Sequence, residues 1–128
     1  MTFRVARHTN DFDAIKHFYT DVLGLESLGE FQSHDNYDGL FIGKAGLGWH
    51  LEFTVSDHTP AHSPDEDDLL VFYLDSVEEF EAAKSRFAAA GIPEESPRNP
   101  YWNRWAATYT DPDGFRIVVS IVKENKPK

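Results

Sequence analysis

Two side chains that could take part in a reaction or bind a ligand alternate with apolar residues in one segment of the chain. His50 and Glu52 alternate with Leu51 and Phe53 within residues 48–55. Because successive side chains of a strand point to opposite faces, a strand here places His50 and Glu52 together on one face and the apolar pair on the other. An imidazole beside a carboxylate can move a proton, bind a metal or hold a polar ligand.

The same alternation assigns three further polar side chains to this face of the predicted sheet. Arg4 and His8 come from the first predicted strand and Arg116 from the last. Arginine is suited to orienting a carboxylate or carbonyl group, so the cluster is typical of a ligand site. A solvated sheet face with surface ion pairs is the alternative. The candidate ligand-binding residues on the strands are therefore Arg4, His8, His50, Glu52 and Arg116.

A metal site is a second interpretation of part of this cluster. His8, His50 and Glu52 together offer two imidazoles and one carboxylate, a known composition of open metal sites. In that case a divalent metal is the cofactor and Glu52 is the catalytic base or a ligand. The interpretation that we favour has no cofactor.

An aromatic and basic loop precedes a predicted strand at residues 105–109. It contains Tyr101, Trp102 and Arg104. The two rings can stack on a flat ligand while Arg104 meets its negative charge, so these three residues join the candidate ligand-binding set. A dimer contact or a plug on the sheet edge is the alternative.

Periodicity orders these residues into two similar halves. The first half contains a strand, an amphipathic helix with its N-cap at Asn10 or Asp11 and its end near Gly24, and three more strands. The second half repeats this order, with a capping-box serine at Ser76 and a helix end near Gly91. The predicted strands are 3–8, 25–31, 39–43, 48–55, 69–74, 92–94, 105–109 and 115–122.

The two halves indicate a duplicated unit. Gly48–Thr54 matches Gly114–Ser120 at a shift of 66 residues. We therefore predict an α+β fold of two βαβββ modules in a single domain (1–128), forming a curved, mostly antiparallel sheet with a cleft and with the helices on its outer face. The predicted modules are 1–56 and 69–122, with a linker at 57–68 and a tail at 123–128.

The composition excludes some classes of binding partner. The formal charge is −10, and the sequence has no cluster of Lys and Arg. We therefore expect neither nucleic acid nor an anionic membrane surface as a partner. The chain has no cysteine, which excludes disulfides and thiolate chemistry. It has no apolar run long enough for a signal peptide or a membrane span, and we expect a cytoplasmic protein.

Three segments resemble the glyoxalase/bleomycin-resistance (vicinal-oxygen-chelate) superfamily, which includes dioxygenases. They are His8–Leu25, Glu52–Thr54 and the turn and strand Asp111–Ile117. The resemblance covers nearly the whole chain and implies paired βαβββ modules and a homodimer. These are scaffold features, and they do not choose among the chemistries of the superfamily.

At the positions that bind the metal in metal-dependent members, the residues of this chain differ from the superfamily pattern. The resemblance places these positions at Arg4, at Glu52, near Leu69 and at Val118, and only Glu52 can bind a metal. The resemblance thus implies a protein that binds a small organic molecule, as the drug-sequestering members do, without the standard metal site. The alternative is a metal-dependent glyoxalase-like lyase or isomerase, or a dioxygenase, that uses His8, His50 and Glu52.

Overall fold

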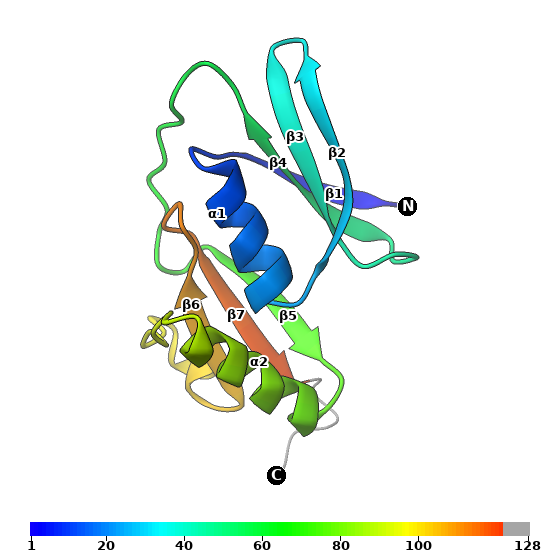
Figure 1. Ribbon diagram of the computed structural model, residues 1–128. Coiled ribbons are helices and arrows are strands. Elements are labelled where there is room, and N and C mark those ends of the chain that lie inside the picture. Colours follow the sequence, from blue (N-terminus) through cyan, green and yellow to red (C-terminus); the bar gives the residue numbers. More distant parts are fainter. Residues whose placement is uncertain (122–128) are drawn as a thin grey trace. The chain divides into compact units, whose positions relative to one another are not determined.

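The computed structural model describes residues 1–121, which form two compact units. Unit 1 is Met1–His62, and unit 2 begins at Ser63, so the division falls within the predicted linker (Figure 1). Unit 1 contains β1 (Phe3–His8), α1 (Phe12–Lys16), the π-helical turn η1 (His17–Val22), β2 (Glu26–His34), β3 (Tyr37–Gly43) and β4 (Trp49–Val55). Unit 2 contains β5 (Leu69–Leu74), α2 (Val77–Ala89), the 3₁₀ helix η2 (Pro100–Asn103), β6 (Ala106–Thr110) and β7 (Arg116–Ile121).

The sheet of unit 1 has the strand order β1-β4-β3-β2. β1 pairs with β4 in parallel, whereas the β3–β4 and β2–β3 pairs are antiparallel. Leu51 and Phe53 of β4 are buried, as the alternation predicts. The residues between them therefore lie on the opposite face, which we call the polar face of unit 1.

The helix of unit 1 begins where the sequence predicts. The side chain of Asp11 caps it by accepting from the backbone N–H of Ala14 at 3.0 Å. The helix then widens into η1, and its apolar residues, which include Ile15 and Tyr19, are buried. The ring of Tyr19 lies 4.9 Å from that of Phe53, which fixes the helix on the apolar face of the sheet.

Unit 2 repeats this plan with one strand fewer. Its sheet has the order β5-β7-β6, with β5 and β7 parallel and β6 and β7 antiparallel. Ser76 caps α2 through the N–H of Glu79, and α2 packs on one face of this sheet (Figure 1). Gly91 follows the C-cap of α2, and its φ of 75° is favourable only for glycine. No helix within residues 1–121 is long and apolar enough to span a membrane.

The α+β prediction with two similar modules is confirmed, but one predicted strand is wrong. Residues 92–94 form no strand, and the segment pairs with β6 only through an isolated bridge between Glu95 and Thr108. Pro93 explains the difference, since proline has no N–H to donate to a ladder. Within residues 1–121 the strands form two sheets, one per unit, and each sheet includes a parallel pair.

A stacked aromatic pair lies at the centre of unit 2. The rings of Phe87 and Tyr109 are 3.8 Å apart and tilted by 6°. Burial raises the pKa of Tyr109 from 10.0 to about 12, and the negative charges of Glu94 and Glu81 add to the shift. The folded chain therefore keeps this phenol protonated at a pH where the unfolded chain releases the proton.

This shift predicts a loss of stability at high pH. Below about pH 10 both states hold the phenolic proton, and between about pH 10 and 12 only the folded state does, so the free energy of unfolding should fall as pH rises. Urea midpoints measured across this range should show a steeper fall in the natural chain than in Tyr109→Phe. Parallel curves for the two proteins would contradict the assigned pKa.

Candidate functional site

Arg4 is the centre of a polar cluster on the polar face of unit 1. The strand register places Arg4 opposite His50, and Ala6 opposite Glu52. The Nε–H of Arg4 donates to Nε2 of His50 at 2.9 Å, and its NH1 lies 3.6 Å from Oε1 of Glu52. The structure therefore brings together three of the predicted site residues.

An aromatic ring that the sequence prediction missed completes this cluster. Phe41 of β3 lies opposite Glu52, and the guanidinium carbon of Arg4 is 5.1 Å from the centroid of its ring. The same ring meets His50 edge-on at 5.9 Å. Phe41 lies two residues from Gly39 and from Gly43, and this alternation could have placed it on the polar face. We call Arg4, Phe41, His50 and Glu52 the Arg4 cluster.

A second ring extends the aromatic surface of this cluster along the sheet. Phe31 of β2 lies opposite Gly39, and its ring occupies the space that a Cβ at Gly39 would need. The ring centroids of Phe31 and Phe41 are 5.7 Å apart. The polar face of unit 1 thus presents two adjacent rings beside one guanidinium group.

The cluster is suited to binding an anion or a carbonyl oxygen and unsuited to binding a cation. Because Arg4 donates to Nε2, neutral His50 carries its proton on Nδ1, and the lone pair that a metal would use is engaged. The side chain of Arg4 is 49% exposed, whereas that of Glu52 is 14% exposed. The N–H groups of Arg4 that make neither contact are therefore the donors that the cluster can offer to a ligand.

His8 does not join this cluster. It lies opposite Thr54, four residues along β1 from Arg4, which corresponds to about 13 Å of strand. Its Nε2 is 2.9 Å from the hydroxyl of Ser56, which also lies 3.0 Å from Nδ1 of His58. Within residues 1–121 no group of three or more His, Cys, Asp or Glu side chains is placed to hold a metal ion. The set His8, His50 and Glu52 therefore does not form a metal site.

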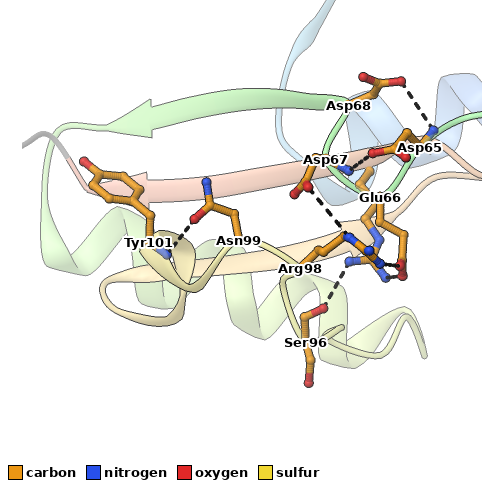
Figure 2. Close-up of polar contacts among 9 residues, drawn as sticks. Asp65, Glu66, Asp67, Asp68, Ser96, Arg98, Asn99 and Tyr101 are labelled. Atoms are coloured by element: carbon orange, nitrogen blue, oxygen red, sulfur yellow. Dashed lines mark hydrogen bonds and ion pairs between the residues drawn. The ribbon is translucent and has the colours of Figure 1, made fainter.

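Arg116 is held by unit 2 itself. Its NH2 lies 2.8 Å from Oε2 of Glu66, and its NH1 donates to the carbonyl of Ser96 at 3.0 Å. Arg98 binds the other oxygen of Glu66 at 3.3 Å and lies 3.9 Å from Asp67 (Figure 2). Sequence reasoning did not find Glu66, because its partners lie 32 and 50 residues away in the chain.

The aromatic loop contains η2 and packs on its own unit. Asn99 caps η2 through the N–H of Tyr101 (Figure 2), and the rings of Tyr101 and Trp102 meet edge-on at 4.8 Å. Trp102 lies 6.4 Å from the ring of Tyr73 on β5. Tyr101 is 58% exposed and Arg104 is also exposed, so both remain accessible to a ligand.

The positions of unit 2 that correspond to the Arg4 cluster are mostly apolar. Leu69 lies opposite Arg116, as Arg4 lies opposite His50, and Val118 takes the place of Glu52. Val118 is fully buried. Neither side chain has a lone pair for a metal, so the residues present do not fit the metal site of the metal-dependent superfamily members.

Family models match most of the chain. The YycE-like N-terminal domain matches residues 3–54, and the YycE-like C-terminal domain matches residues 67–120. An uncharacterized protein YycE of Bacillus subtilis (strain 168) is 41% identical over 116 residues, which are 90% of this chain and 84% of that protein. The crystal structure of a Bacillus subtilis YycE protein of unknown function matches with a TM-score of 0.87 and 40% identity, covering 95% of this chain and 90% of that one.

More distant solved structures share the fold alone. The trypanothione-dependent glyoxalase I of Leishmania major matches with a TM-score of 0.74 and 20% identity, over 97% of this chain and 88% of that one. TnmS3, an antibiotic-binding protein of Streptomyces sp. CB03234, matches with a TM-score of 0.69 and 21% identity, over 94% of each chain. The chain belongs to the YycE-like family, within the glyoxalase/bleomycin-resistance (vicinal-oxygen-chelate) superfamily.

Proposed function

We propose that this protein binds a small organic molecule at the Arg4 cluster, without a metal held by the protein. The observation that carries the proposal is the side chain of Arg4, which is half exposed and whose guanidinium contacts His50, Glu52 and the ring of Phe41. A fixed, exposed guanidinium binds a carboxylate or carbonyl oxygen with little loss of side-chain entropy. The antibiotic binding of TnmS3, a protein of the same fold, supports this class of function.

The aromatic rings suggest the shape of the ligand. Phe31 and Phe41 lie side by side next to Arg4, so a flat apolar body can cover the rings while its oxygen meets the guanidinium. A binding function is also consistent with the contacts of the two side chains that could transfer a proton. His50 and Glu52 both contact Arg4, and neither is needed as an acid or base if the protein only binds.

The test compares a planar aromatic carboxylate with a matched neutral compound. Calorimetric titration with 2-naphthoate and with 2-naphthalenemethanol should give tighter binding of the carboxylate. Arg4→Gln should weaken naphthoate binding about tenfold, because it removes a charge-assisted hydrogen bond. Tryptophan fluorescence of the natural chain and of Trp102→Phe, followed in the same titrations, would test whether the aromatic loop of unit 2 binds the compound by itself.

Arg7→Gln is the matched control. It makes the same change of charge on the same strand, but Arg7 lies on the opposite face, with its guanidinium carbon 5.7 Å from the ring centroid of Phe53. Arg7→Gln should leave naphthoate affinity within about twofold, since exposed charges at this distance are screened by salt. Equal losses in the two variants would show that net charge, and not the Arg4 cluster, governs binding.

The other predicted ligand contacts stay proposals, each for its own unit. They are His8 in unit 1 and Tyr101, Trp102, Arg104 and Arg116 in unit 2. We propose a homodimer, as the superfamily resemblance implies, and we propose that it acts in the cytoplasm. Light scattering after size exclusion should give twice the mass of the chain, and the mass of one chain would contradict the dimer.

A further inference from the structure

A groove on unit 2 is separate from every residue discussed as a ligand contact. It has a volume of about 470 Å³ and lies where the last turns of α2 meet the segment that follows the helix. Lys84, Ser85 and Ala88 line it from α2, residues 91–94 line it from the connecting segment, and Tyr109 lines it from β6. These residues come from α2, from the segment that follows it and from β6, all within unit 2.

Tyr109 brings a fixed hydroxyl group to this groove. The residue is only 2% exposed, and its ring is held by the stack on Phe87. Its hydroxyl is not among the enclosed polar atoms that lack a partner within residues 1–121, so it keeps access to solvent at the groove that Tyr109 lines. A hydroxyl held in place at the wall of a groove can accept a hydrogen bond from a ligand.

Charged groups of both signs lie at this groove. Glu94 and Lys84 both line it, and Glu94 and Glu81 are close enough to Tyr109 to raise its pKa. The C-terminal end of α2 adds the partial negative charge of its dipole over the last turn. The ammonium group of Lys84 lies 5.4 Å from the ring centroid of Phe80, one turn back along α2. Lys84 therefore contacts an aromatic ring of its own helix and does not pair with Glu94.

We propose that this groove binds the primary ammonium group of a small organic amine. The ammonium group donates hydrogen bonds to the carboxylate of Glu94 and to the hydroxyl oxygen of Tyr109. A short apolar tail lies against Ala88 and Ile92, which line the same groove. This site adds a second ligand class, of opposite charge to the one proposed for the Arg4 cluster.

The test uses the full ¹⁵N-labelled chain and benzylammonium as the probe, with benzyl alcohol as the neutral control of the same shape. Benzylammonium should shift the backbone amides of residues 84–94 and of Tyr109 in a saturable way. Glu94→Gln should weaken binding about tenfold, because it keeps the shape of the side chain and removes its charge. Tyr109→Phe, which preserves the stack on Phe87, should weaken binding about threefold through loss of one acceptor.

Two control variants separate binding in this groove from a general effect of charge and from binding at the Arg4 cluster. Glu78→Gln removes the same charge at the opposite end of α2 and should leave the affinity unchanged, as should Arg4→Gln. Equal binding of benzyl alcohol, or an unchanged affinity in Glu94→Gln, would show apolar adsorption and overturn the proposal. Shifts that do not saturate, or that map away from the groove, would also overturn it.

Discussion

Replacing Phe87 with alanine is expected to lower the free energy of unfolding by about 3–5 kcal/mol. Phe87 is fully buried and its ring stacks on Tyr109, so the substitution removes both apolar contact area and an aromatic pair. Phe87→Leu should cost less, because it refills most of the cavity and loses mainly the stacking. Urea unfolding followed by tryptophan fluorescence measures both changes.

Val77 provides the control on the same helix. It is 39% exposed at the start of α2, and Val77→Ala should change the free energy of unfolding by no more than about 0.5 kcal/mol. A similar small loss in Phe87→Ala would mean that the stacked pair is not the packed centre of unit 2. The difference between the two variants therefore tests the core independently of any ligand.

Replacing Arg116 with alanine is the second large change, with an expected cost of about 1–3 kcal/mol. The side chain is 13% exposed and bonds both Glu66 and the carbonyl of Ser96, so alanine leaves that carbonyl and one oxygen of Glu66 without this donor. Glu66 is 54% exposed and can regain water, which places the cost below that of breaking a fully buried pair. Thermal unfolding at low and high salt measures the loss.

Arg98→Ala is the control that separates the effect of burial from the effect of charge. It contacts the same Glu66, yet its side chain is 65% exposed. Arg98→Ala removes the same charge and should cost less than about 1 kcal/mol, and less still at high salt. Equal costs for the two arginines would refute a special role for the buried one.

The fold was largely predictable because its signals are local. The alternation at Leu51 and Phe53, the caps at Asp11 and Ser76, and the glycine at residue 91 each specify a short stretch of backbone, and the structure has all of them. The π-helical turn η1 was not predictable, since residues buried at a spacing of three and four suit either kind of helix.

The candidate site was predictable only as far as strand register extends. Arg4, His50 and Glu52 meet because β1 and β4 are paired in parallel, and the face that each occupies can be deduced from the sequence. The separation of His8 from His50 depends on where along the strands the pairing begins, which periodicity does not specify. The ion pair between Arg116 and Glu66 depends on the path of the segment before β5. That segment has no repeating pattern of apolar residues from which its path could be predicted.

The contact between Phe31 and Gly39 links two positions on neighbouring strands. Since the ring of Phe31 occupies the space of a Cβ at residue 39, any larger residue there must displace the ring. The residue at position 39 therefore determines the aromatic surface beside Arg4 without touching the polar residues of the cluster. Under the proposed function, a larger side chain at 39 should therefore change which ligand shapes fit the rings while the charged groups of the Arg4 cluster stay in place.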